Sequence, residues 1–152
     1  MNAADALQYA IRALSARALT EHELTKKLRS RKVSAKDIQA ILERLREYNF
    51  VNDTAIAIRA SEDTSLGRYG VKRKLMARGI NKHLVEDVLQ NRDESEDLEA
   101  ALVLLGKYQN RFTGERAQQK AVAFFMRRGF SFTTAKKALE QHGLGLDEEI
   151  EE

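Results

Sequence analysis

The chain of 152 residues contains no cysteine, proline or tryptophan, and it has only eight glycines. Without cysteine there is no disulfide, no thiolate nucleophile and no Cys-ligated zinc site. Because proline breaks helices and glycine weakens them, their scarcity leaves long stretches free to be helical. Hydrophobic residues make up 43% and charged residues 32%. This balance supplies a core and argues against wholesale disorder.

Long apolar runs and targeting signals are missing too. The longest apolar runs, 100–105 and 121–126, are too short to cross a bilayer. The N-terminus lacks a basic stretch followed by an apolar block, so no secretory signal is expected. Residues 1–20 have a faint transit-peptide composition, but Asp5 and the regular apolar spacing favour a first structural helix. We therefore expect a cytoplasmic protein.

The charge is unevenly distributed along the chain. The formal net charge of +3 divides into +4 for residues 1–49, +3 for 50–92 and −4 for 93–152. The negative share lies mainly in residues 93–99 and 147–152. Without those two stretches the chain is clearly basic, which favours polyanionic partners.

Three similar segments follow one another. A shift of 47 residues aligns 24–28 with 71–75, and a further shift of 50 aligns 78–80 with 128–130. Each segment contains three amphipathic helical patterns. The predicted fold class is all-α, with three tandem three-helix repeats in an elongated, curved arrangement. The expected domains are repeats at 1–50, 51–92 and 93–142, followed by an acidic flexible tail at 143–152.

Polar residues mark the expected helix starts. Thr20 and Glu23 form a capping box pattern, in which each side chain accepts a hydrogen bond from the other's backbone N–H. Ser34 and the pair Asn52-Asp53 are further N-caps. Thr113 is expected to cap the second helix of the third repeat.

Glycines mark two of the expected helix ends. Gly79 and Gly129 stand where second helices end, and glycine adopts the left-handed conformation of a helix stop without a Cβ clash. Lys32 has the corresponding place in the first repeat. The turn there is therefore expected to be made differently.

No catalytic or metal-binding pattern is visible. His22, His83 and His142 lie far apart and at unrelated positions of the repeats, which is typical of surface histidines. Zinc-protease, phosphate-loop and dinucleotide-binding motifs are absent. The acids at 93–97 fit a solvated helix start better than a cation site. We expect a protein that is not an enzyme and needs no cofactor.

Three windows, 24–36, 64–85 and 116–139, are rich in Lys and Arg and contain no Asp or Glu. Each covers a second helix and the turn into the third. Solvated helices usually mix both signs, so this recurrence favours a basic stripe that binds phosphates or acidic protein patches. The cations at the predicted stripe are Lys26, Lys27, Arg29, Arg31, Arg68, Lys72, Arg73, Arg78, Arg127 and Arg128.

The aromatic residues fall into two groups. Tyr69, between Arg68 and Gly70, fits either a ring that stacks on a base or partner side chain, or a core ring at a helix start. The spacing of Phe124, Phe125, Phe130 and Phe132 predicts the core of the last repeat.

The middle of the chain resembles the RecX family of bacterial recombination regulators, in Phe50-Val-Asn-Asp53 and in Gly67-Arg-Tyr-Gly70-Val-Lys-Arg-Lys-Leu75-Met-Ala-Arg-Gly79-Ile80. Residues 6–50 resemble that family's opening repeat, and the third segment matches more loosely. The chain departs at Ile56-Ala57 and Ala60-Ser-Glu62, where the family often has Tyr-Ala and Phe-Val-Arg, which leaves the contacts of that helix open.

The resemblance implies three three-helix repeats that bind the RecA recombinase filament on single-stranded DNA. It implies regulation, usually inhibition, of RecA in homologous recombination, DNA repair and the SOS response. The interface residues that it implies are Arg68, Tyr69, Gly70, Lys72, Arg73 and Arg78.

Two other functions fit the residues. Three-helix modules also act as helix-turn-helix readers, so a stand-alone DNA-binding protein is one alternative. A helical-repeat adaptor for an acidic protein is the other. We expect the RecA filament as the partner, single-stranded or duplex DNA as a further ligand, no membrane association, and a monomer. Residues 147–152 are expected to fold over the basic stripe and weaken binding.

Overall fold

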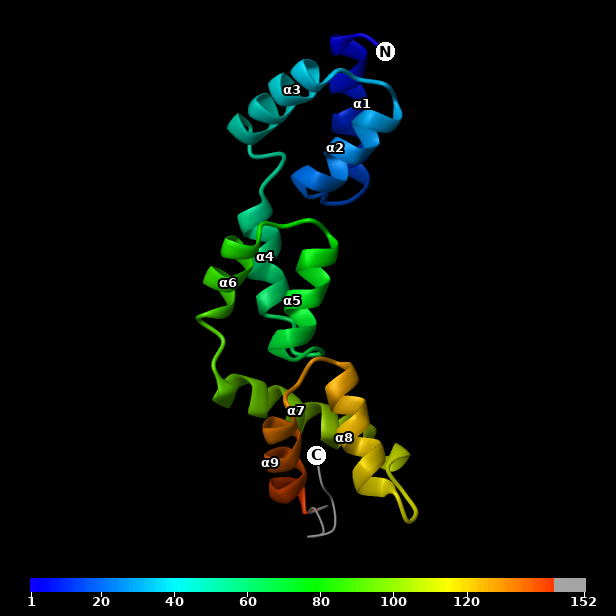
Figure 1. Ribbon diagram of the computed structural model, residues 1–152, viewed down its shortest axis with the longest axis vertical. Helices are drawn as coiled ribbons and strands as arrows, with labels where there is room; N and C mark the ends of the chain where they lie inside the picture. The colour runs from blue at the N-terminus through cyan, green and yellow to red at the C-terminus, as the bar shows by residue number, and fades with distance from the viewer. Residues whose placement is uncertain (144–152) are drawn as a thin grey trace. The chain divides into compact units, whose positions relative to one another are not determined.

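The computed structural model describes residues 1–143, and within that range it contains nine α-helices, one short 3₁₀ helix and no strand. The all-α prediction is confirmed. Most of the predicted acidic tail, residues 144–152, lies outside the described residues. The elements (Figure 1) are α1 (Ala3–Ala16), α2 (Glu21–Ser30), α3 (Ala35–Glu47), α4 (Asp53–Ser61), α5 (Arg68–Ala77), α6 (Lys82–Leu89), α7 (Glu94–Tyr108), η1 (Gln109–Arg111), α8 (Ala117–Arg127) and α9 (Phe132–His142).

The helices form two compact units. The first comprises residues 1–59 with 75–85, and the second comprises 60–74 with the residues from 86 onward. Helices α4, α5 and α6 each contribute residues to both units. The predicted repeat boundaries at 50 and 92 fall between helices. The division into three repeats and their stacking stay predictions.

The core of the first unit lies among α1, α2 and α3. Helix α1 contributes Ala6 and Ala10, whose small side chains let the other two helices approach closely. Helices α2 and α3 contribute larger residues at the spacing of one helix face. The residues of these two helices that are buried are Leu24, Leu28, Ile38, Ile41, Leu42 and Leu45.

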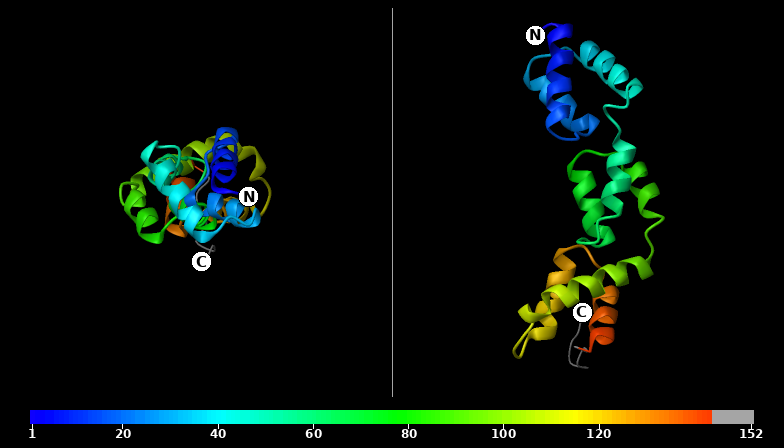
Figure 2. Two further views of the ribbon diagram at one scale, coloured as in Figure 1. Left: turned by 90° about the horizontal axis from the view of Figure 1, so that it is seen from above. Right: turned by 180° about the vertical axis from the view of Figure 1, so that it is seen from behind.

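The core of the second unit is aromatic. Helix α9 packs against both α7 and α8 (Figures 1 and 2). Phe124, Phe125 and Phe130 are buried, and Phe132 packs against them while partly exposed, as the spacing predicts. The rings meet edge to face, with centroids 5.4 Å apart for Phe124 and Phe125 and 5.5 Å apart for Phe125 and Phe130. Such contacts add to the free energy of burial.

One turn recurs at three places in the chain. The left-handed residues are Lys32 (φ 62°), Gly79 (φ 79°) and Gly129 (φ 87°), each following a second helix. In every case the N–H of the next residue donates to a carbonyl five residues back, as from Val33 to Leu28 at 3.1 Å. This is a Schellman turn, in which the bonded pair is also buried.

The expectation that the first turn would differ is therefore wrong. Lys32 adopts the left-handed conformation although it has a Cβ atom. The hydrogen bonds of the turn and the buried Leu28 and Val33 hold it there. Glycine is thus favoured in this turn but not required.

A capping residue follows each turn and starts the third helix. The side chains of Ser34, Asn81 and Ser131 accept backbone N–H groups two or three residues on, at 3.2, 2.8 and 3.1 Å. The offsets of 47 and 50 residues found in the sequence hold for both the turns and these caps. The prediction for Thr113 is wrong, because α8 begins after Arg116 without a side-chain cap.

The predicted capping box of α2 is present and is joined to a distant arginine. Glu23 accepts the Thr20 N–H (2.9 Å), and Thr20 Oγ1 accepts the Glu23 N–H (3.1 Å). The Thr20 hydroxyl also donates to the Arg78 carbonyl (2.7 Å), and the Arg78 guanidinium donates to Glu23 (2.9 Å). The start of α2 is thereby tied to the end of α5 within the first unit.

Glycines in the second unit allow its backbones to touch. The Gly67 N–H donates to the Arg128 carbonyl (2.9 Å), and the Tyr69 N–H donates to the Gly129 carbonyl (3.1 Å). A Cβ atom at Gly129 would overlap the backbone of Gly70. The start of α5 therefore lies directly against the α8–α9 turn.

We predict that Gly129→Ala lowers the free energy of unfolding by roughly 2–4 kcal/mol, since it combines left-handed strain with a backbone overlap. The matched control is Gly106→Ala in α7, where a Cβ would meet nothing within 4 Å. Removing a mid-helix glycine there is expected to raise stability by about 0.5–1 kcal/mol. Urea denaturation followed by circular dichroism measures both. Equal effects at the two positions would contradict the close packing.

The capping box predicts a pH-dependent stability. Burial alone would raise the pKa of Glu23, but hydrogen bonds from Arg78 and the Thr20 N–H, with the charges of Arg78 and Arg17, hold this pKa below its usual value. Since the folded pKa is lowered, the stabilisation is fully present above the unfolded pKa of about 4.3 and is lost as pH falls through the folded pKa.

Glu23→Gln should therefore destabilise the protein at pH 7, and its difference from the unsubstituted protein should shrink below about pH 4. Urea midpoints at pH 7, 5 and 3.5 test this. Glu47→Gln, at an exposed position, is the control and should show no such trend. A Glu23→Gln difference that stays constant with pH would argue against the ion pair as its source.

Candidate nucleoprotein interface

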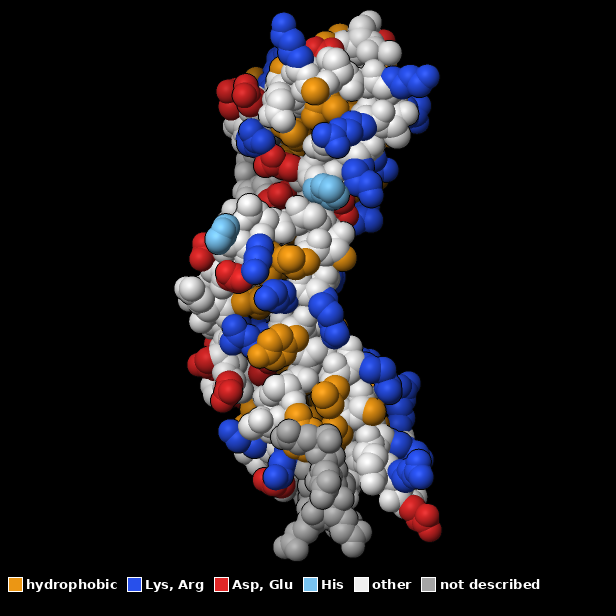
Figure 3. Space-filling view, in the orientation of Figure 1, with side chains coloured by type: hydrophobic (Ala, Val, Ile, Leu, Met, Phe, Trp, Pro, Cys, Tyr) orange, Lys and Arg blue, Asp and Glu red, His pale blue; other side chains and the backbone are white. Residues whose placement is uncertain are grey.

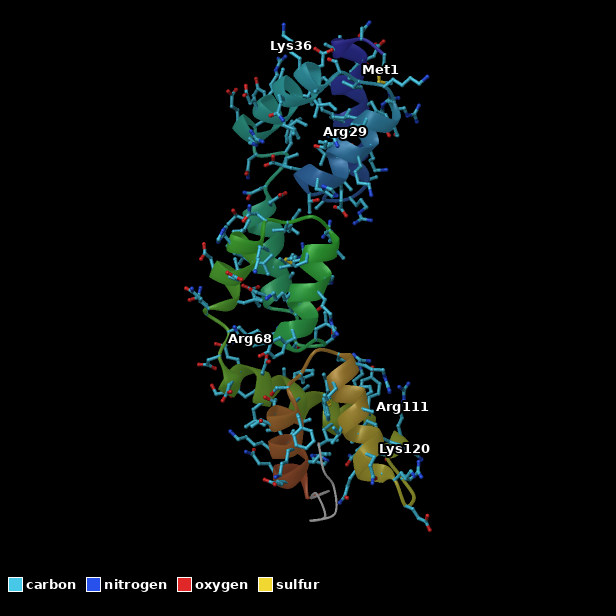
Figure 4. The ribbon with its side chains drawn as sticks, in the orientation of Figure 1. Met1, Arg29, Lys36, Arg68, Arg111 and Lys120 are labelled. Carbon is cyan, nitrogen blue, oxygen red and sulfur yellow. The ribbon has the colours of Figure 1, made fainter. Side chains whose placement is uncertain are left out.

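Helix α2 presents exposed cations that no acid neutralises. Lys26, Lys27 and Arg29 are exposed, while Leu24 and Leu28 face the core. None of the three cations forms an ion pair within residues 1–143. The helix's two acids are engaged elsewhere, Glu21 with Arg46 and Glu23 with Arg17 and Arg78. Arg29 lies on α2 (Figure 4).

Exposed basic residues also occur in the second unit, at the start of α5 and the end of α8. Arg73 and Arg127 are both exposed, and the Arg73 guanidinium donates to the Arg127 carbonyl (3.1 Å). Lys72 is half-buried. Figure 3 shows Lys and Arg side chains on the visible surface of each unit. Continuity of the stripe from repeat to repeat stays a prediction.

Tyr69 projects from this region into solvent. Its side chain is 55% exposed, while its backbone N–H is held by the Gly129 carbonyl. The alternative of a core ring is therefore wrong. An exposed aromatic ring on a fixed backbone, beside cations, suits stacking on a base or on a partner's side chain.

Three predicted contact residues, Arg31, Arg78 and Arg128, occupy the same place before each Schellman turn. A cation at a helix C-terminus is favoured by the helix dipole. The Arg31 guanidinium lies 4.8 Å from the centre of the Tyr9 ring. Arg78 bonds Glu23 and the Ala18 carbonyl. Arg128 lies over the Phe124 ring at 4.5 Å and bonds the Ser65 carbonyl. All three therefore tie their turns to neighbouring segments.

Arg68 and Gly70 also make contacts inside the protein. The Arg68 guanidinium donates to the Arg92 carbonyl (3.2 Å) and its N–H donates to Asp97 (3.1 Å). Gly70 is buried, and a Cβ there would overlap the Arg128 carbonyl. These two residues place Tyr69 and Arg73, and a direct role in contacting a partner stays a prediction.

Sequence reasoning missed a buried ion pair. Arg92 and Asp97 are 4% and 3% exposed, and Arg92 Nε donates to Asp97 at 2.7 Å. Arg92 also donates to the carbonyls of Ser61, Asp63 and Leu66, and so holds the loop before α5. The assignment of Asp97 to a solvated helix start is wrong. Its spacing from Ala100, Ala101 and Leu104 places it on the apolar face of α7, which was the available signal.

Two further properties bear on function. Within residues 1–143, no group of three or more His, Asp or Glu side chains is placed to hold a metal ion. Over the same residues, the helices are too short or too polar to span a bilayer.

The comparisons with known proteins agree on one family. The family model described as "RecX, first three-helix domain" matches residues 6–45. The chain is 35% identical over 136 residues to the Regulatory protein RecX of Deinococcus radiodurans, with 89% of this chain and 67% of that protein covered. It is 29% identical over 141 residues to the Regulatory protein RecX of Streptococcus pneumoniae strain Hungary19A-6, with 90% and 55% covered.

The chain thus spans between about half and two thirds of the length of these relatives. Solved structures share the fold. A crystal structure of RecX from Lactobacillus salivarius superposes with a TM-score of 0.78 at 24% identity, covering 93% of this chain and 97% of that one. A second, described as regulatory protein RecX, has a TM-score of 0.77 at 24% identity and covers 91% and 73%. The identity of 35% to the Deinococcus radiodurans protein, with 67% of its length covered, shows that the chain belongs to the RecX family.

Proposed function

We propose that this protein regulates homologous recombination and DNA repair by binding the RecA nucleoprotein filament and inhibiting RecA. The observation that carries the proposal is the 35% identity, over 89% of the chain, to a protein named as a RecX regulator. The proposed site of action is the cytoplasm, and the proposed form is a monomer. The relatives' name describes regulation, which matches a chain without a catalytic motif.

The exposed cations support a polyanionic partner. Among residues 1–143, Lys26, Lys27 and Arg29 form no ion pair, so their charges are available to a phosphate or an acidic protein patch. Tyr69 and Arg73 add an aromatic and a basic contact on the second unit. Several modest contacts on one linked chain give a combined affinity well above that of any single contact.

Binding alone is a sufficient mechanism of regulation. A ligand shifts an equilibrium by the difference between its affinities for the two states. A protein that binds one conformation of a filament more tightly than another, or that occupies the surface needed for strand exchange, lowers the rate of the steps that require the other arrangement. Inhibition of ATP hydrolysis then needs no catalytic residue on the regulator.

The alternatives make different predictions. A stand-alone DNA-binding protein would bind DNA with steep salt dependence and leave RecA activity unchanged at saturating DNA. An adaptor for an acidic protein would show little affinity for DNA. Measuring RecA ATPase activity and DNA binding side by side separates the three functions.

We expect the protein to reduce RecA ATP hydrolysis on single-stranded DNA. The triple variant Lys26→Gln, Lys27→Gln, Arg29→Gln should require at least about tenfold more protein for the same inhibition, since three exposed charge contacts are lost. The measurement is the ATPase rate against protein concentration, at fixed salt.

The matched control removes three exposed cations from α1, α3 and α4 of the same unit, by Arg12→Gln, Arg44→Gln and Arg59→Gln. It should inhibit nearly as well as the unsubstituted protein. An equal loss of inhibition in both variants would mean that net charge, and not the position of the cations on α2, explains the effect. An unchanged ATPase rate with the unsubstituted protein in large excess would reject the proposed function.

A further inference from the structure

Tyr108, at the end of α7, is surrounded by cations. The Lys107 ammonium lies 5.4 Å from the centre of its ring, the Arg111 guanidinium 4.9 Å and the Arg128 guanidinium 5.3 Å. The three come from α7, η1 and the end of α8, so the folding of the second unit brings them together. Neither Lys107 nor Arg111 belongs to the basic windows of the sequence.

These positive charges are not neutralised inside the protein. None of the three cations forms an ion pair in the described part of the chain. All three charged groups lie within 5.4 Å of one ring centre, so the distances between them are comparable to the screening length of about 10 Å at 0.1 M salt. They therefore repel one another. Contact with the ring offsets only part of this repulsion at an exposed site.

The members of this cluster differ in how firmly they are held. The Arg128 guanidinium donates to the Ser65 carbonyl (3.2 Å) and also lies over the Phe124 ring. The Tyr108 ring packs against Phe124, with centroids 5.3 Å apart. Lys107 and Arg111 are exposed. The cluster thus has an arginine and a ring held by further contacts, and two exposed cations beside them that a ligand can reach.

The ligand that fits this chemistry is an oxyanion with several oxygens. Guanidinium forks and an ammonium group donate to phosphate oxygens in short, charge-assisted hydrogen bonds. The Tyr108 ring is only partly exposed and has three cations around it, so a ligand meets mainly positive charge at this place. Such a cluster contacts the sugar–phosphate backbone without reading its sequence.

The surrounding segment favours a polyanion over a single ion. Residues 107–128 contain six basic residues and one acid, Glu115. Arg111 lies in η1 before α8 and Lys120 lies on α8 (Figure 4), where its ammonium donates to the Thr113 carbonyl (3.2 Å). A run of successive phosphates meets such a surface at several points and releases bound counterions as it does so.

We propose that Lys107, Arg111 and Arg128, held around the Tyr108 ring, form a binding site for the phosphate backbone of single-stranded nucleic acid. Tyr108 is a positioning residue in this site, and its hydroxyl is not required. The site deepens the proposed function, since it identifies one surface with which the chain would meet the DNA of a nucleoprotein filament.

The test is binding of a fluorescent oligothymidylate to the full chain, without RecA, at several salt concentrations. The double variant Lys107→Gln, Arg111→Gln should bind about tenfold more weakly at low salt, and its slope of log affinity against log salt should fall by about 1.4, or 0.7 for each lost phosphate contact. The charge-matched control Lys136→Gln, Lys137→Gln, on α9 of the same unit, should change both quantities much less. Tyr108→Phe should bind as the unsubstituted protein does, and Tyr108→Leu, checked for folding by circular dichroism, should bind more weakly without loss of charge.

Three results would overturn the site: equal loss in the Lys107/Arg111 variant and the control, absence of oligonucleotide binding by the unsubstituted protein, or complete competition by millimolar inorganic phosphate at matched ionic strength. The last would assign the cluster to free phosphate. If the oligonucleotide is not bound but the double variant weakens RecA inhibition, the cluster meets an acidic protein surface instead. The RecA ATPase assay tests the proposed function separately. If the oligonucleotide binds through this cluster but RecA ATP hydrolysis is not inhibited, the proposed function is rejected and the site is retained.

Discussion

The left-handed turn between second and third helices is the constraint on which the rest of the structure depends. It reverses the chain within three residues, buries an apolar pair such as Leu28 and Val33, and is followed at once by a capping residue. The carbonyls at the helix end are satisfied by the turn, and the N–H groups of the next helix by the cap. Because these demands are local, the same solution recurs with different side chains, even where lysine replaces glycine.

The same turn divides the basic residues into two groups. The arginine immediately before each turn is drawn back onto the protein, to an aromatic ring or to a carboxylate and carbonyls. Cations two and four residues earlier, such as Arg29 and Lys27, are exposed instead. A count of positive residues in a window therefore overstates the charge that a partner meets. Position relative to the turn, as well as charge, decides how firmly a basic residue is held.

The local parts of the fold were predictable from sequence, and the long-range parts were not. Thr20 with Glu23 and Ser34 act within three residues, so their patterns identified the caps correctly. Lys32 was misjudged because the hydrogen bonds of the turn and the burial of Leu28 and Val33 outweigh the preference for glycine there. Arg78 looked free because its partner Glu23 lies 55 residues away. The cluster at Tyr108 was also missed. Lys107 and Arg111 are close to Tyr108 in sequence, but Arg128 is brought near the ring only by the packing of the second unit.

The sharing of α4, α5 and α6 between the two compact units has a consequence for biosynthesis. The first unit needs residues 75–85 in addition to the first 59, so an emerging polypeptide cannot complete it until residue 85 has left the ribosome. The intervening residues 60–74 belong to the second unit, whose other residues are synthesised only after residue 85. The first unit can therefore complete its contacts before the second, because all of its residues precede residue 86.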